Sequence, residues 1–280
     1  MGEGGYRTRI APTVSGLLHV GHARTFLAAC ARAREAGGKV VLRIDDIDFE
    51  RCSKEYEDAA VADMKGAGIF WDEGPDVGGA FGPYRQSERI PSYEAAMREL
   101  AARGFAYPSP HSRGEIKKLA RGRARGFGFC DAEPVFPPEL RPPAGARFEF
   151  SGDFARANWR FRVPDGESVR FSDSLAGEMS FVCGEDFGDF LVWRKCGAPS
   201  YELASAVDDA QMRITEIVRG EDLLLSTARQ ILVWRALGLE IPKFRHCPLL
   251  LGDDGKKLSK TSMRKGGGSK WLMRRRTGRG

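Results

Sequence analysis

The chain has 280 residues, enough for one large domain or two modest ones. Its 42% hydrophobic and 29% charged residues are typical of a folded globular protein and exclude an intrinsically disordered chain. No run approaches the ~20 apolar residues that span a bilayer, and the first residues lack a signal-peptide pattern, so we expect a cytoplasmic protein without membrane contact. The six cysteines form no C-x-x-C pair, which excludes a disulfide framework.

The formal net charge of +6 is unevenly distributed along the chain. Residues 255–280 contain ten basic and no acidic residues, and residues 113–125 contain six basic residues and one acidic residue. The remainder is acidic, so the sequence predicts two local regions for an RNA partner rather than general polyanion binding. For the basic tail, the alternative is a solvated chain end.

The N-terminal third predicts a strand, a helix and a second strand. Tyr6–Ala11 is an apolar and basic run before a proline, and Leu17–Ala36 has helical apolar spacing that stops at Gly37 and Gly38. Lys39–Ile44 is a β-branched run typical of a buried strand. Strands joined through a helix are expected to pair in parallel, as a βαβ unit.

Further along, the pattern predicts helices, a proline-rich interruption and then strands. The expected helices are Ser53–Ala67, Pro91–Arg103, Tyr201–Ala210 and Ser226–Leu237. The expected strands are Trp159–Val163, Val169–Asp173, Phe190–Arg194, Arg213–Arg219 and Pro248–Gly252. Pro108–Gly152 is rich in proline and lacks periodicity, so we interpret it as part of an insertion.

These elements predict an α/β fold, with a Rossmann-like parallel-sheet catalytic domain and an inserted α+β subdomain. The expected bounds are residues 1–107 and 195–265 for the catalytic domain and 108–194 for the insertion. Residues 266–280 are expected to form a flexible basic tail.

Two histidines, His19 and His22, flank Gly21 at the expected start of the first helix. Side chains three residues apart share a helix face, and a helix N-terminus offers N–H groups and a positive dipole end that suit triphosphate oxygens. Gly21 leaves room for a flat base to approach the backbone. The alternative is a pair of surface histidines; a metal site is not expected because no third ligand accompanies them.

A second motif, KLSKT, contains Lys257, Ser259 and Lys260. A loop with two lysines can close on phosphates and neutralise the charge that develops on a leaving pyrophosphate. Taken alone, the string is equally typical of a solvated basic segment.

Together the two motifs resemble the H-I-G-H and K-M-S-K-S pair of the class I aminoacyl-tRNA synthetases. The strings RIAPT (9–13), LRIDDID (42–48), YRQSER (84–89) and IVRGEDL (217–223) are similar to the glutamyl-tRNA synthetase branch. The resemblance spans residues 7–260 and implies the class I catalytic fold. Glutamyl-tRNA synthetases continue into a helical anticodon-binding domain, whereas only 19 residues follow Thr261 here, so we expect no anticodon-binding domain.

This shortened form resembles the glutamyl-queuosine tRNA(Asp) synthetase family. The resemblance implies an ATP- and Mg²⁺-dependent ligase that activates L-glutamate to glutamyl-adenylate. We expect the protein to be a monomer. The glutamyl group is then transferred to queuosine at the wobble position, in the anticodon stem-loop of tRNA(Asp).

The resemblance also implies the role of each site residue. His19, His22 and Lys260 are the expected catalytic residues, and Gly21, Lys257, Ser259 and Lys260 the expected ATP contacts. The expected glutamate contacts are Arg9, Ala11, Thr13, Asp45, Tyr201 and Arg219. The chemistry agrees, because a substrate with two carboxylates and one ammonium needs cationic forks and a carboxylate. Singly, each is also readable as a surface arginine, a helix-preceding aspartate or a core tyrosine.

The chain departs from the family at two places. Asp45 stands where the family has glutamate, so we expect a shifted backbone, a bridging water or weaker glutamate affinity. The family's zinc ligands are largely absent: Ser109, His111 and Cys130 offer too few ligands for a closed tetrahedral site, and we predict no structural zinc.

Three other functions are compatible with parts of the sequence. The nearest is a shortened glutamyl-tRNA synthetase that charges tRNA(Glu), and another is a non-catalytic RNA-binding relative. A general nucleotidyltransferase with an H-x-G-H motif is the third, but it leaves Arg9, Tyr201 and Arg219 unexplained.

Overall fold

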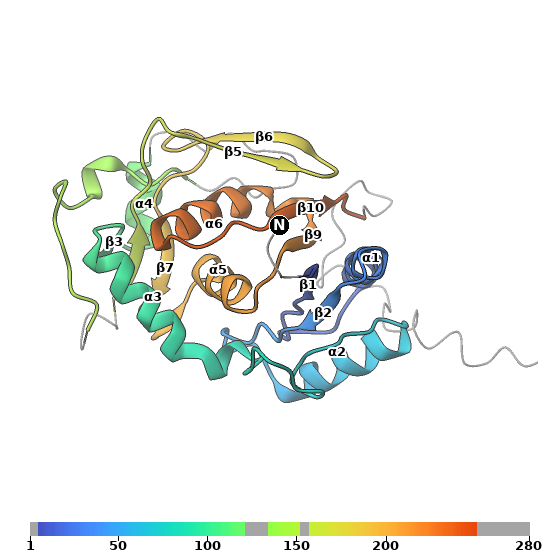
Figure 1. Cartoon of the computed structure of the whole chain (residues 1–280). Coiled ribbons are helices and arrows are strands. Elements are labelled where there is room, and N and C mark those ends of the chain that lie inside the picture. The colour runs from blue at the N-terminus through green and yellow to red at the C-terminus, as the bar shows by residue number, and fades with distance from the viewer. Residues whose placement is uncertain (1–4, 121–133, 152–156, 251–280) are drawn as a thin grey trace, which may run out of the picture. The chain divides into compact units, whose positions relative to one another are not determined.

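The computed structural model describes residues 5–120, 134–151 and 157–250 (Figure 1). By packing, the chain forms two compact units. The first comprises Met1–Glu88, Ile214–Gly220 and Cys247–Gly280, and the second comprises Arg89–Arg213 and Glu221–His246. The division into a catalytic domain, an insertion and a tail stays a prediction.

The first unit is built on a βαβ arrangement. Strand β1 (Arg7–Ile10) pairs in parallel with β2 (Lys39–Leu42), in a register that joins Arg7 to Lys39 and Ile10 to Leu42. Helix α1 (Val20–Glu35) connects them. The strand, helix and parallel strand expected from the sequence are therefore confirmed.

A third strand, β9 (Glu216–Gly220), lies beside β1 although about 200 residues separate them in the sequence. The backbone N–H of Thr215 donates to the carbonyl of Arg7 at 2.9 Å, and the Thr8 hydroxyl donates to the carbonyl of Glu216 at 2.8 Å. These contacts bring a late segment of the chain next to the first strand.

The core of the first unit lies between α1 and these strands (Figure 1). Helix α1 buries Phe26, Ala29, Cys30 and Ala33, which repeat at helical spacing on one face. Where the chain turns into β2, a Cβ on Gly38 would lie 2.2 Å from the carbonyl oxygen of Tyr6, so only glycine fits this approach.

Helix α2 (Lys54–Gly66) packs against the same core through Ala60 and Met64. The Ser53 hydroxyl caps it by accepting a hydrogen bond from the backbone N–H of Tyr56 at 3.3 Å. The cap confirms the helix start expected at Ser53. A short 3-10 helix, η1 (Gln86–Arg89), follows a loop that is rich in glycine and contains proline.

The second unit combines helices with two groups of strands. Its three long helices pack against one another: α3 (Ile90–Ala102), α5 (Tyr201–Gln211) and α6 (Leu224–Leu237). One antiparallel sheet has the order β3 (Ala106–Ser109), β4 (Asn158–Phe161), β7 (Phe190–Arg194), β8 (Ala198–Pro199). A hairpin of β5 (Ser168–Asp173) and β6 (Gly177–Val182) pairs in parallel with β10 (Lys243–Cys247) through Asp173 and Phe244. Two short 3-10 helices are η2 (Pro138–Leu140) and η4 (Glu221–Leu223).

One expected strand is wrong, and one helix was not anticipated from the sequence. Pro248–Leu250, the described part of the strand expected at Pro248–Gly252, is not a strand. The strand is β10, whose buried Phe244 and His246 alternate with polar residues. In the proline-rich interruption, α4 (Arg113–Leu119) forms because Ser112 and Glu115 make a reciprocal capping box.

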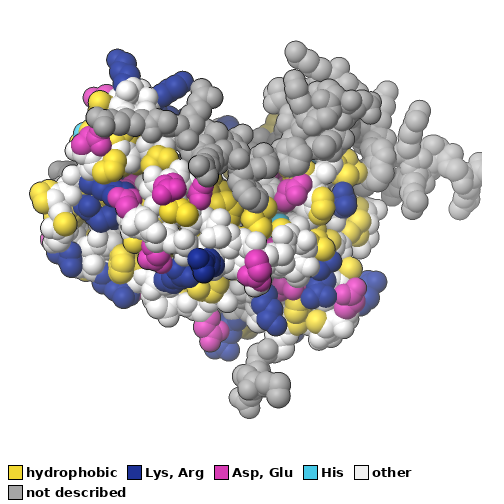
Figure 2. Space-filling model, turned by 90° about the horizontal axis from the view of Figure 1, so that it is seen from above, with side chains coloured by type: hydrophobic (Ala, Val, Ile, Leu, Met, Phe, Trp, Pro, Cys, Tyr) yellow, Lys and Arg dark blue, Asp and Glu magenta, His cyan; other side chains and the backbone are white. Residues whose placement is uncertain are grey.

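No helix in the described part of the chain is long and apolar enough to cross a membrane. On the face shown in Figure 2, basic, acidic and apolar side chains are interspersed. The described atoms of this face therefore form no patch of a single charge sign.

Candidate functional site

The site residues expected in the first unit lie where β1, β2 and β9 end. Arg9 is in the second half of β1, Asp45 follows β2 by three residues, and Arg219 is the penultimate residue of β9. The strands run in the same direction, because Thr8 contacts Glu216 and Arg9 contacts Val218. Ligands of open parallel sheets bind at the carboxyl edge of the strands, which is the edge that these residues occupy.

The segment after β1 is joined directly to Asp45. The backbone N–H of Asp45 donates to the carbonyl of Pro12 at 3.1 Å, and Thr13 and Asp45 form a parallel bridge. Ala11 is half-buried and Thr13 is exposed, whereas Asp45 is buried. The structure thus brings the 9–13 string and the 42–48 string together, although they are about 30 residues apart in the sequence.

The two arginines expected to bind carboxylates are buried cations. Arg9 and Arg219 are each 4% exposed, and Arg9 Nη1 donates to the carbonyl of Val218 at 3.4 Å. Buried guanidinium groups retain their charge and offer several donors in a fixed plane, which suits recognition of a carboxylate.

Asp45 forms a buried ion pair with Arg43. Arg43 Nε lies 2.6 Å from Asp45 Oδ1, and Arg43 Nη2 lies 3.2 Å from Oδ2, in a fork geometry. Sequence reasoning missed Arg43. The pattern that indicates it is a charged residue within the apolar run of an expected strand, followed two residues later by an aspartate. Residues i and i+2 of an extended chain lie on the same face, so the two side chains can pair.

The histidine pair lies at the N-terminus of α1, where His19 is the N-cap residue. The two imidazole rings are stacked, with 3.7 Å between centroids. The backbone N–H of His19 donates to His22 Nδ1 at 3.2 Å, so the proton of a neutral His22 ring resides on Nε2. The N-terminus of a helix and an imidazole N–H both favour an anion, and this chemistry fits a polyphosphate.

The local structure explains why residue 21 is a glycine. A Cβ at this position would lie 3.0 Å from two atoms of the His19 ring, which is tighter than an ordinary contact. The glycine therefore leaves room for the His19 imidazole, in addition to the expected approach of a base.

Several expected site residues cannot be added to this geometry. Tyr201 is the first residue of α5 and belongs to the second unit, with Ser200 as the N-cap. Lys257, Ser259 and Lys260 lie outside the described residues, as does the tail from residue 266. Their roles stay predictions.

Glu73 of the first unit is held in a structural ion pair instead of serving the site. Arg7 donates to both of its oxygens, at 2.8 and 3.1 Å, and the Tyr84 hydroxyl donates to Oε2 at 2.8 Å. The hydrogen bonds from Arg7, aided by Tyr84 and opposed by burial, hold the Glu73 pKa below its ordinary value. An ionised, fully engaged carboxylate does not act as a general acid.

The region expected to lack a structural zinc contains Ser109 at the end of β3, where it is buried, and His111 just beyond it. Cys130 lies outside the described residues. Within the described ranges, no three His, Cys, Asp or Glu residues are grouped to hold a metal ion. The absence of zinc remains a prediction, because one of the three candidate ligands, Cys130, is not among the described residues.

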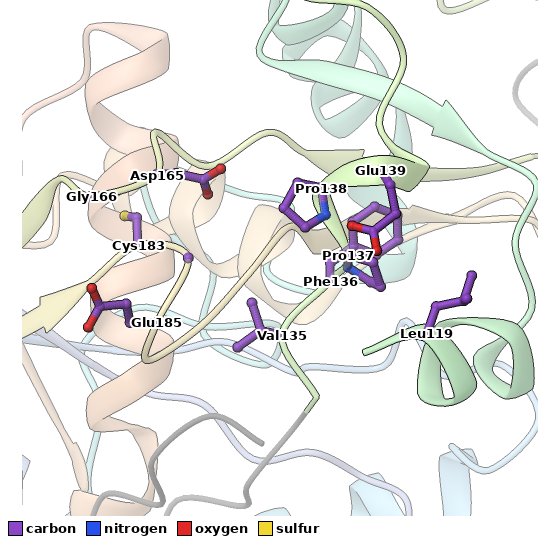
Figure 3. A pocket seen from close by; sticks show the side chains of 11 residues that line it. Leu119, Val135, Phe136, Pro137, Pro138, Glu139, Asp165, Gly166, Cys183 and Glu185 are labelled. Carbon is purple, nitrogen blue, oxygen red and sulfur yellow. The ribbon is translucent and has the colours of Figure 1, made fainter. Parts of the chain in front are cut away.

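A cavity of about 470 Å³ lies within the second unit and contains none of the expected site residues (Figure 3). Phe136, Pro137 and Pro138 form an apolar part of its wall, and Asp165 and Cys183 lie across from them. Burial, together with the charges of Glu167 and Asp165, raises the pKa of the Cys183 thiol to about 12. This thiol is therefore protonated and unreactive near neutral pH.

Comparison with protein families agrees with the fold. The family model described as "tRNA synthetases class I (E and Q), catalytic domain" matches residues 6–273. The chain therefore belongs to the class I aminoacyl-tRNA synthetases, a family of ligases, and to their glutamate and glutamine branch. The predicted family and its Rossmann-like α/β fold are confirmed.

Two groups of relatives stand out in the comparison. The chain is 46% identical over 254 residues to a glutamyl-Q tRNA(Asp) synthetase of Symbiobacterium thermophilum, covering 90% of this chain and 77% of the relative. It is 41% identical to glutamate–tRNA ligase 2 of Nitrosococcus oceani, covering 93% of this chain but only 54% of the ligase. The chain thus spans about half the length of the glutamate–tRNA ligases that it matches.

A solved structure has the same fold. The glutamate tRNA ligase from Elizabethkingia meningosepticum, in complex with its amino acid, superposes with a TM-score of 0.77 at 29% identity. The match covers 94% of this chain and 53% of the ligase. The described fold is therefore similar to that of about half of this ligase chain.

Proposed function

We propose that the protein activates L-glutamate with ATP and transfers the glutamyl group to queuosine in the anticodon stem-loop of tRNA(Asp). The observation that carries the activation step is the placement of Arg9, Asp45 and Arg219 at the carboxyl ends of neighbouring strands, in the unit whose first helix has His19 as its N-cap and His22 in its first turn. Both charge signs needed by a zwitterionic dicarboxylate are present there.

In the first step, an oxygen of the glutamate α-carboxylate attacks the α-phosphorus of ATP. The bond from this phosphorus to the bridging oxygen of the β-phosphate breaks, and pyrophosphate leaves. Arg9 and Arg219 bind and orient glutamate, whereas His19 and His22 at the helix N-terminus stabilise negative charge on the phosphates. The protein needs no covalent intermediate.

In the second step, a hydroxyl oxygen of queuosine attacks the carbonyl carbon of glutamyl-adenylate. The carbon–oxygen bond to AMP breaks, the hydroxyl proton passes to solvent, and AMP leaves. Positioning of the two reactants supplies most of the acceleration of such a transfer.

Mg²⁺ enters this scheme as part of the nucleotide substrate. Magnesium binds mainly through substrate phosphates and one or two carboxylates, and it neutralises charge on the phosphates. Such a metal would arrive with ATP and would be held mainly by its phosphates. Lys257 and Lys260 are proposed to add positive charge at the leaving pyrophosphate.

Two measurements test the proposal. Glutamate-dependent exchange of pyrophosphate into ATP, without tRNA, is expected for the activation step, and its absence in folded, ATP-binding protein would contradict activation. For the transfer step, labelled glutamate should appear on tRNA(Asp) that contains queuosine and be absent from the same tRNA with guanosine at that position.

A second candidate is a shortened glutamyl-tRNA synthetase, which is favoured by the 41% identity to a glutamate–tRNA ligase. It predicts label at the terminal adenosine of tRNA(Glu) instead. A non-catalytic RNA-binding relative is distinguished by Lys260→Ala, which would leave the function of such a protein intact but is expected to abolish exchange in an activating enzyme.

A further inference from the structure

The Arg43–Asp45 pair is unusual because both charges are buried at the expected glutamate site. The Arg43 side chain is fully buried and that of Asp45 is 6% exposed. A buried charge is costly unless an ion pair and hydrogen bonds compensate it, and the fork of 2.6 and 3.2 Å supplies both. The Arg43 guanidinium therefore orients the Asp45 carboxylate before any ligand binds.

The backbone adds to this orientation. The N–H of Arg43 donates to the carbonyl of Ile10 at 3.0 Å, and the N–H of Asp45 donates to the carbonyl of Pro12 at 3.1 Å. Both residues are thus fixed to the exit of β1, in the 9–13 string. The guanidinium and the carboxylate project from neighbouring positions on one face of the same extended segment.

The pair still permits contact with a ligand. An ionised carboxylate has about four acceptor positions on two oxygens, so it accommodates a guanidinium fork and an ammonium together. Asp has a shorter and less flexible side chain than Glu. The position of its carboxylate therefore depends on the backbone and on the side chain that pairs with it. Here that side chain is Arg43.

We infer that Arg43 is a positioning residue for glutamate binding: it holds the Asp45 carboxylate in the orientation that accepts the substrate's ammonium group. The inference deepens the proposed function and rests on its activation step. Arg43 contacts Asp45 and acts on the ligand only through it. By fixing the Asp45 carboxylate, Arg43 allows an aspartate to bind the ammonium group at a position where the longer side chain of glutamate would reach it unaided.

The test is a double-mutant cycle in the exchange reaction, with KM for glutamate, KM for ATP and kcat measured separately. Asp45→Asn and Arg43→Lys are each expected to raise the KM for glutamate about 10- to 100-fold, with the KM for ATP within about twofold. If Arg43 acts through Asp45, the double variant should match Asp45→Asn alone within about threefold. Effects that multiply would show that Arg43 acts independently of Asp45 and would overturn the inference.

Arg89→Lys is a matched control, because Arg89 Nε lies 2.6 Å from Asp208 Oδ1 in an equally buried pair of the second unit. A merely structural loss should affect Arg89→Lys and Arg43→Lys alike, lowering their melting temperatures without a change in the KM for glutamate. An unchanged KM in folded Arg43→Lys would therefore remove the inference alone. Unmodified protein that neither binds glutamate nor supports exchange would remove the proposed function as well.

If Arg43→Lys does not fold, Arg43→Met in combination with Asp45→Asn replaces it, because this combination buries no unpaired charge. The inference then predicts the same KM for glutamate as Asp45→Asn alone. A further rise of tenfold or more would overturn it.

Discussion

His246 Nδ1 lies 2.6 Å from Asp173 Oδ2, and both side chains are fully buried. The other ring nitrogen of His246 lies 2.9 Å from the Thr227 hydroxyl. Asp173 Oδ1 also accepts the backbone N–H groups of Leu175 and Ala176, at 2.9 and 2.8 Å. One carboxylate therefore joins β10, the β5–β6 turn and, through the histidine, α6 within the second unit.

This arrangement predicts a pH-dependent contribution to stability. Burial by itself would raise the pKa of Asp173, but hydrogen bonds from His246 and the turn backbone outweigh it and hold the pKa well below its ordinary value. A depressed carboxyl pKa stabilises the fold above the unfolded pKa of about 4, and this stabilisation is lost as the pH falls through the folded pKa. Asp173→Asn should thus lower the free energy of unfolding by about 3 kcal/mol near pH 7 and by less near pH 3.

Urea unfolding of both proteins at the two pH values measures this difference. The exposed Asp58→Asn is the control and should change stability by about 0.5 kcal/mol or less. A gap between unmodified protein and Asp173→Asn that stays constant from pH 7 to pH 3 would contradict the assignment.

A second prediction concerns Gln230 of α6, which is fully buried. Its side-chain oxygen and nitrogen have no hydrogen-bond partner among the described residues. An unsatisfied buried polar group costs about 1–3 kcal/mol, so Gln230→Met, of similar shape, should raise the free energy of unfolding by about that amount.

Thr227→Val on the same helix is the control, because the buried Thr227 hydroxyl, unlike the Gln230 amide, has hydrogen-bond partners: His246 and the carbonyl of Leu223. It should destabilise the protein by about 1–2 kcal/mol. Chemical denaturation measures both variants, and a Gln230→Met protein less stable than the unmodified one would show that the amide has a role in the folded state.

The cysteines should differ in reactivity. Cys196 is exposed, whereas Cys183 is buried and its thiol pKa is raised to about 12 by burial and by nearby carboxylates. Because the thiolate is the nucleophile, iodoacetamide at about pH 8 should alkylate Cys196 at least tenfold faster than Cys183. Peptide mass spectrometry over time measures both rates, and Cys196→Ser provides the control. Equal rates in folded protein would refute the assigned burial of Cys183.

The exposed face of α4 should contribute to RNA binding without affecting glutamate activation. Lys117 and Lys118 are exposed there. If both contact phosphates, Lys117→Ala with Lys118→Ala should reduce the slope of log affinity against log salt by about 2 and leave exchange unchanged. Arg98→Ala, at an exposed cation of α3, is the control. An unaltered slope would remove α4 from the RNA-binding surface.

Local patterns were sufficient for several parts of the molecule. The stretch from Tyr6 to Ile44 predicted a strand, a helix and a parallel strand, because apolar spacing and glycine stops depend on neighbouring residues only. The same local order placed His19 at a helix N-terminus. The ordered motifs identified the family, since their joint occurrence is specific although each is short.

Pairings between distant residues depended on the tertiary structure. The sequence indicated Asp45 as a carboxylate for the ligand, but only the folded segment shows that Arg43 holds it. Likewise, 73 residues separate Asp173 from His246, and the hydrophobic run at Pro248–Leu250 looked more like a strand than β10. The sequence by itself thus determined the family, the first βαβ unit and most site residue types, whereas the tertiary structure decided which charges are paired. The reason is physical: periodicity records how one segment meets the core, whereas an ion pair requires two side chains to be buried at one point.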